Sequence, residues 1–272
     1  MTLADALTRF LEADAATTRD RYTARKLPAA QSRIAAIFRR QGRTFLDGFG
    51  RFRATIDADA VKESLDSSDW LPLWMATAGG TSSDFSATMA AMFLDALIIG
   101  GDNMMRSLDV DGGELSISWD LDNPRAIAYA EAHAAAQVTK IDETTRLYLN
   151  SMISQAVADG MSYTRLSEMI ADRFVEFATG GNNPRSRRIA IFELGDAYEA
   201  GQEQMARELM KAGIPLQKKW LTVGDDRVRP SHRSNQAQGW INYDDNYSSG
   251  DFRPPSDPGC RCVTLTRRKK TV

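Results

Sequence analysis

The side chains best suited to chemistry lie close together near the end of the sequence. One of the two histidines, His232, and both cysteines, Cys260 and Cys262, fall within 31 consecutive residues. Imidazole and thiolate groups are ligands that zinc prefers, and two thiols at i and i+2 of an extended segment project from the same side. These three residues are therefore a candidate structural zinc site, with Asp225, Asp257 or water as the fourth ligand.

Two other interpretations of this group stay open. In the first, no metal binds, the thiols are small packed groups under Trp220 or Trp240, and His232 makes a hydrogen bond that fixes a loop. In the second, a cysteine and the histidine form a nucleophilic pair, but no acid stands at a convincing position to orient it. The sequence also lacks a phosphate-binding glycine loop, a dinucleotide-binding fingerprint and an HExxH motif. The other histidine, His133, lies in an alanine-rich run, which favours a packed or surface position.

The composition indicates a cytoplasmic protein with an uneven distribution of charge. The two cysteines make a poor disulfide pair because a single residue separates them, which favours a reducing compartment. The first residues lack the features of a signal peptide, and the longest apolar stretch, residues 90–99, is too short to span a bilayer. From residue 181 onward there are 16 Lys and Arg against 11 Asp and Glu, compared with 18 against 25 before it. This basic part is either a solvated surface or the side that meets an acidic partner.

Apolar residues at intervals of three and four predict a mainly α-helical chain. A long amphipathic helix is expected over residues 28–56, with Pro28 near its start, where a missing N–H costs little. Residues 85–108 are apolar almost all round, which is typical of a buried helix. Gly100 and Gly101 interrupt this run, and we expect a kink or an end there.

The middle of the chain combines one strand signal with further helices. Alternation between Leu115 and Trp119 predicts a strand. Asp142 and Ser162 are expected N-caps, and residues 179–184 are the best linker in the chain. The helices predicted here cover residues 124–140, 142–159, 162–177 and 185–210.

The residues from 219 to 262 contain too many prolines and glycines for one long helix and predict a small, loop-rich unit. We expect its short sheet around Trp220, Trp240 and Cys262. The predicted class is therefore mainly α, with a long-helix N-terminal region, residues 1–123, followed by a small α+β, loop-rich C-terminal domain, residues 124–272. A short, frayed basic tail ends it, formed by Arg267, Arg268, Lys269 and Lys270.

The order of residue types in the last 45 residues or so resembles the phage Mu protein F-like head morphogenesis domain. The resemblance extends over roughly residues 125–265 and includes the preceding helix, where Glu193 stands at the acidic position. Two features differ from the family: Gly239 follows Gln238 instead of an aspartate, and the segment before Cys260 is unusually short. The residues that carry the resemblance are Trp220, Asp225, Arg227, Arg229, His232, Gly239, Asp257, Pro258, Cys260 and Cys262.

The resemblance implies a minor capsid protein of a tailed phage or prophage that has no established catalytic role. Such a protein joins the immature head, associates with the portal and aids head assembly and DNA packaging or ejection. The implied partners are the portal protein, capsid or scaffold proteins and packaged DNA, without a membrane. The implied location is the capsid interior, after assembly in the host cytoplasm. Residues 1–123 would dock on the portal or capsid lining, and Arg267, Arg268, Lys269 and Lys270 would contact DNA or the portal.

Two alternative functions rest on the residues themselves. The first is a metal-dependent enzyme acting on nucleic acid, with His232 beside an aspartate pair such as Asp225 and Asp226. The second is a DNA-binding module without catalysis, whose affinity would fall steeply with salt concentration.

Overall fold

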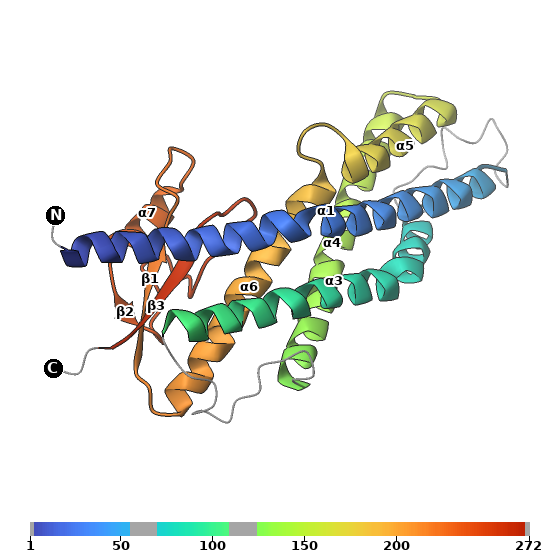
Figure 1. The fold of residues 1–272 in the computed structure, drawn as a ribbon. Helices are drawn as coiled ribbons and strands as arrows, with labels where there is room; N and C mark the ends of the chain where they lie inside the picture. Colours follow the sequence, from blue (N-terminus) through green and yellow to red (C-terminus); the bar gives the residue numbers. More distant parts are fainter. Residues whose placement is uncertain (1–2, 55–69, 109–123, 270–272) are drawn as a thin grey trace. The chain divides into compact units, whose positions relative to one another are not determined.

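The computed structural model describes residues 3–54, 70–108 and 124–269, and in the first range it describes the side chains of residues 18–51. Six helices and one small sheet make up these residues, so the predicted mainly α class with a small α+β C-terminal part is confirmed (Figure 1). The strand predicted near Leu115–Trp119 lies outside the described residues. The elements are α1 (Leu3–Ala54), α3 (Leu71–Ser107), α4 (Pro124–Ala158), α5 (Tyr163–Thr179), α6 (Arg185–Lys211), β1 (Leu216–Leu221), α7 (Pro230–Ala237), β2 (Ile241–Asn242) and β3 (Val263–Arg268).

These elements form two compact units that interleave along the chain. Unit 2 contains Ala29–Ala90 and Glu131–Arg187. Because α1, α3 and α4 each contribute to both units, the units differ from the division at residues 123 and 124, which stays a prediction. Unit 1 contains Met1–Pro28, Ala91–Ala130 and Arg188–Val272.

Unit 2 has an aromatic core. The ring of Phe45 lies 6.2 Å from that of Trp74 in an edge-on arrangement, and Phe49 stacks on Tyr163 at 4.6 Å. Such pairs stabilise a core beyond the area that they bury. The amide nitrogen of the buried Gln41 side chain donates hydrogen bonds to Thr81 and to Asp142. The fully buried large side chains of this core include Phe38, Phe45, Phe49, Trp70, Trp74 and Phe85.

Helix α1 is longer than predicted and does not begin near Pro28. It runs from Leu3 to Ala54 with Pro28 inside it. A proline in a helix interior removes one hydrogen bond and costs about 3 kcal/mol. Leu27 and Ala30 are buried on either side of it, so packing of the helix offsets that cost.

In unit 1, helix α3 continues through Gly100 and Gly101 to Ser107, so the helix does not end at these glycines as one of the two expectations had it. Gly100 has another role, which it shares with Gly201 of α6, because α3 and α6 approach each other backbone to backbone. A Cβ at Gly100 would lie 2.0 Å from the carbonyl oxygen of Tyr198, and a Cβ at Gly201 would lie 1.8 Å from that of Leu97. The crossing therefore requires both glycines.

Helix α3 is also long and apolar enough, by length and composition, to cross a membrane. Half of its most apolar 18-residue stretch is buried inside the protein. Buried residues on it include Phe93, Leu97 and Met104, as expected for a helix in the core of a protein.

The predicted helices at 124–140 and 142–159 are one helix, α4. No proline or glycine separates them, and Asp142 lies inside α4, where it accepts a hydrogen bond from Gln41. The N-cap at Ser162 is confirmed, since its side chain accepts from the backbone N–H of Arg165. Helix α6 follows the predicted range to within one residue.

The three strands form an antiparallel sheet in the order β2-β1-β3. Leu216, Lys218 and Trp220 alternate along β1 and are buried, so the sheet presents a lysine where the pattern of a strand favours an apolar residue. Arg267 and Arg268 belong to β3, so the predicted frayed tail is wrong for these two residues. They pair with β1 because strand hydrogen bonds extend to Leu216.

Candidate metal centre

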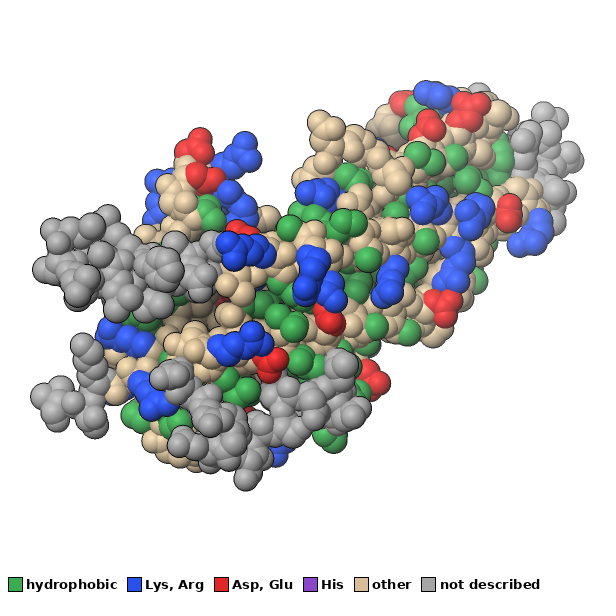
Figure 2. All heavy atoms as spheres, viewed as in Figure 1, with side chains coloured by type: hydrophobic (Ala, Val, Ile, Leu, Met, Phe, Trp, Pro, Cys, Tyr) green, Lys and Arg blue, Asp and Glu red, His purple; other side chains and the backbone are tan. Residues whose placement is uncertain are grey.

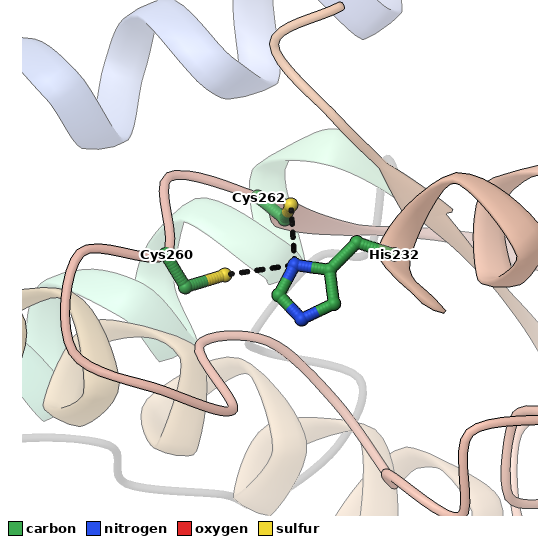
Figure 3. A group of neighbouring side chains, drawn as sticks. All are labelled: His232, Cys260 and Cys262. Atoms are coloured by element: carbon green, nitrogen blue, oxygen red, sulfur yellow. Dashed lines mark hydrogen bonds between the residues drawn. The ribbon is translucent and has the colours of Figure 1, made fainter. Parts of the chain in front are cut away.

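Three side chains from two segments converge beside the sheet (Figure 3). His232 comes from α7, which begins with Pro230 at its first turn. Gly259 has a φ of +83°, which favours glycine and turns the chain just before Cys260. Cys262 is the last residue before β3. The structure thus places together the histidine and the two cysteines that the sequence marks as candidates.

The distances within this group fit a tetrahedral zinc ion. The Nδ1 atom of His232 lies 3.7 Å from Sγ of Cys260 and 3.6 Å from Sγ of Cys262. A tetrahedron with Zn–S of about 2.3 Å and Zn–N of about 2.0–2.1 Å has an S···N edge of about 3.5–3.6 Å. All three donor atoms lie within 4.8 Å of one another.

Hydrogen bonding alone accounts less well for this arrangement. The two thiols approach the same Nδ1 atom, and a neutral imidazole nitrogen has one lone pair to accept with. A cation at the centre interacts favourably with all three donors at once. The donor set itself, one imidazole nitrogen and two thiolates, is also the set that zinc prefers.

The other ring nitrogen of His232 is positioned as in metal-binding histidines. Nε2 lies 2.9 Å from the hydroxyl of Ser256 and 3.9 Å from a carboxylate oxygen of Asp257. With its proton on Nε2, the ring donates to Ser256, and Nδ1 keeps a lone pair directed at the sulfurs. A partner of this kind fixes the tautomer and orientation of a ligating imidazole.

The pKa values of the two thiols shift in opposite directions. A hydrogen bond from Cys262 lowers the pKa of Cys260 to about 6, although burial opposes this. Backbone N–H groups of Cys262 and Ser256 lower that pKa further. The same bond and burial raise the pKa of Cys262. Cys260 is therefore the thiol of the pair that ionises more readily, and a metal ion binding here would displace the protons that the pair still holds.

Aromatic rings enclose the group on one side. The ring of Trp220 lies 5.0 Å from that of His232, and Tyr247 meets Trp220 edge-on at 5.2 Å. Cys262 belongs to the same buried cluster. Trp240 has a different role, since its ring stacks against Arg267 at 4.3 Å.

Arg19 of α1 holds the Cys-Arg-Cys segment and was not found by sequence reasoning. Its guanidinium donates to the carbonyl oxygens of Cys262 and, at 2.9 Å, Arg261. It also lies 3.6 Å from the buried carboxylate of Glu199, which accepts from the backbone N–H of Thr264 at 3.0 Å. Arg19 precedes Cys262 by 243 residues, and no local pattern relates the two.

The aspartates proposed as fourth ligands have other partners. Both carboxylate oxygens of Asp225 bind Arg261, at 2.8 and 2.7 Å. Asp257 lies 3.7 Å from Nε of Arg229, whose guanidinium also donates to the carbonyl oxygen of Pro258. The cluster of three donors includes neither aspartate.

The remaining candidate residues lie outside the cluster. Gly239 has a φ of +70° at the end of α7, where the chain turns into β2. The guanidinium of Arg267 donates to Gln217, and Lys269 donates to Asn242, so both brace the sheet. Lys270 lies outside the described residues. His133 contacts Gln137 within α4.

Comparison with known families gives one match, which includes the whole of this site. Residues 148–265 match the family of Phage Mu protein F like proteins. The Mu F-like region, as we call residues 148–265, confirms the resemblance, although it starts later than residue 125. It relates this part of the chain to phage head proteins. No curated protein and no solved structure matched the chain.

Proposed function

We propose that this chain is a minor head protein of a tailed phage or prophage. In this proposal it joins the immature head, associates with the portal and aids head assembly and DNA packaging or ejection. The observation that carries the proposal is the Mu F-like region, which contains α5, α6, α7 and the metal centre. Residues 1–123 would supply the surface that docks on the portal or capsid lining.

We further propose that one zinc ion binds His232, Cys260 and Cys262 and fixes the loops of the Mu F-like region. The spacing of Nδ1 and the two sulfurs, and the Ser256 contact behind the ring, support this role. A structural zinc ion contributes free energy of folding directly. That contribution suits a segment whose loops have few ladder hydrogen bonds of their own.

The arrangement favours a structural role over a nuclease. Nucleases that use magnesium or manganese hold the ion with carboxylates that are free to bind it. Asp225 instead accepts two hydrogen bonds from Arg261, and the guanidinium of Arg261 lowers the pKa of that carboxyl. Plasmid DNA incubated with the protein and magnesium or manganese should therefore remain uncut.

The head assignment is tested by co-expression with the portal protein of the same phage. The two should elute together from a size-exclusion column at physiological salt. The portal of an unrelated phage is the control and should elute apart. Consistent separation from the cognate portal would contradict the assignment.

The metal assignment is tested by elemental analysis of protein purified without chelator, which should contain about one zinc per chain. His232→Ala should remove the zinc, whereas His133→Ala should not. Zinc at equal levels in both variants would place the ion elsewhere.

A further inference from the structure

A small pocket opens beside the three metal-binding side chains. His232, Cys260 and Cys262 line it on one side, and Arg227, Arg229 and Arg261 line it as well. Its volume is about 10 Å³, which is room for one water-sized atom. A sugar or a base is too large for it, so the group that enters is a single atom at the end of a ligand.

The three arginines differ in how strongly they are neutralised. Arg261 binds Asp225 through both carboxylate oxygens, and Arg229 lies near Asp257. Among the described residues, the guanidinium of Arg227 has no hydrogen bond or ion pair within contact distance, although Asp225 attracts it at longer range. Arg227 therefore retains a donor fork that is available to an anion.

The surroundings place these charges where a nucleic acid can reach them. Arg229 is the N-cap of α7 and makes no side-chain cap bond, so the positive end of the helix lies at the pocket. Arg227, Arg229 and Arg261 are exposed. Figure 2 shows both acidic and basic side chains on the protrusion above α7.

The donor set explains why this pocket lies next to the metal centre. Zinc takes four ligands, and a site with three protein ligands keeps one position for water or another small ligand. The three donors identified here all border the pocket, and neither Asp225 nor Asp257 joins them. The fourth position therefore faces a space of one atom lined with arginines.

We propose that this pocket takes one phosphate oxygen of a DNA backbone as the fourth ligand of the metal ion. Arg227 and Arg229 bind the remaining oxygens of the same phosphate through their forks. The small volume excludes bases, so the contact positions DNA without reading its sequence. This inference rests on the metal centre of the proposed function.

Cobalt substitution tests whether phosphate or DNA binds at the fourth position of the metal ion. The full chain is loaded with Co²⁺, whose visible absorption bands report the number and type of its ligands, and inorganic phosphate or a short DNA duplex is then added. We expect both additions to shift the bands. A shift with phosphate alone would overturn DNA as the source, and no shift with either would overturn the open position while leaving the metal centre intact. If cobalt does not bind at all, the metal centre of the proposed function fails and this proposal with it.

A charge variant tests the arginine contact. Arg227→Ala should weaken duplex binding by about 10-fold and lower the slope of log affinity against log salt by about 1. Arg165→Ala removes an exposed arginine from α5 and is the matched control, with both values unchanged. The cobalt bands without ligand should be the same in both variants. Equal loss of affinity in the two variants would show general attraction to charge and overturn the site.

Discussion

The aromatic core of unit 2 and the sheet region of unit 1 are held together by different interactions. Unit 2 buries rings such as Phe45 and Trp74, and its helices satisfy their own backbone groups. The sheet region, by which we mean residues 216–265 together with Glu199 of α6, relies more on buried ionisable groups, among them Glu199, Lys218 and His232. Helices need only an apolar face to pack, whereas loops leave backbone groups that require specific polar partners.

Lys218 illustrates the second kind of interaction. It is fully buried, donates to the carbonyl oxygen of Phe252 at 2.7 Å and lies against the rings of Tyr243 and Tyr247 at 5.4 Å each. Burial lowers its pKa to about 7. The loop around Phe252 is therefore arranged about the amino group of Lys218.

Loss of the proposed metal ion should have the largest effect, and that effect should be confined to the sheet region. We expect chelation, or Cys262→Ser, to lower the free energy of unfolding of this region by on the order of 5 kcal/mol or more. Hydrogen exchange followed by mass spectrometry should show protection lost over residues 216–265 and kept over residues 131–187. His133→Ala is the control and should change neither range. Equal loss in both ranges would show that the two regions do not differ in this way.

Phe45→Ala is the corresponding test for unit 2, since it should destabilise that unit and leave the sheet region intact. Removing a fully buried ring leaves a cavity and should cost about 3–5 kcal/mol. Urea denaturation measures the loss, and hydrogen exchange should locate it in residues 29–51 and 131–179. The zinc content should stay unchanged. A fall in bound zinc would mean that the core of unit 2 also supports the metal centre.

Glu199 should make the stability of the sheet region depend on pH. Burial raises the pKa of Glu199 from 4.5 to about 7, although Arg19 and the Thr264 N–H group lower it. Between these values the folded protein holds a proton that the unfolded chain has released. The free energy of unfolding therefore falls as pH rises from about 4.5 to about 7, by about 3 kcal/mol, and does not fall further above that range.

Glu199→Gln should remove this decline. Urea denaturation at about pH 5 and at about pH 8 gives the change in the free energy of unfolding between the two pH values, for the variant and for the unchanged protein. Subtracting one change from the other removes the contributions of all other titrating groups, including the cysteines. Glu168→Gln changes an exposed carboxyl on α5 and serves as the control. If the Glu199 variant shows the same decline as the unchanged protein, Glu199 does not hold a proton in the folded state.

Local patterns predicted the elements that local interactions determine. The Ser162 cap and helix α6 followed from residue types a few positions apart. Both cysteines and His232 were predicted to form one site because imidazole and thiolate groups are ligands that zinc prefers. The structure places them together, and the metal itself stays a prediction.

Features that depend on distant partners could not be predicted in the same way. Gly100 reads as a helix breaker until α6 is known to cross it. Arg19 reads as one more helix arginine until its contact with the carbonyl of Cys262 is seen. Lys218 interrupts an apolar pattern, and only its contact with Phe252 explains its burial. In each case the deciding atom belongs to a segment far away in the sequence.

The smallest effect should come from the N-cap of α5, which is an exposed and local polar contact of unit 2. The Ser162 side chain accepts from the Arg165 N–H at 3.2 Å. Ser162→Ala leaves that N–H to water and should lower the free energy of unfolding by about 1 kcal/mol, whereas Ser162→Asp keeps an acceptor and should cost little. Urea denaturation of both variants measures this. A loss several-fold larger would mean that unit 2, like the sheet region, depends on single polar contacts, and the difference between the two regions would disappear.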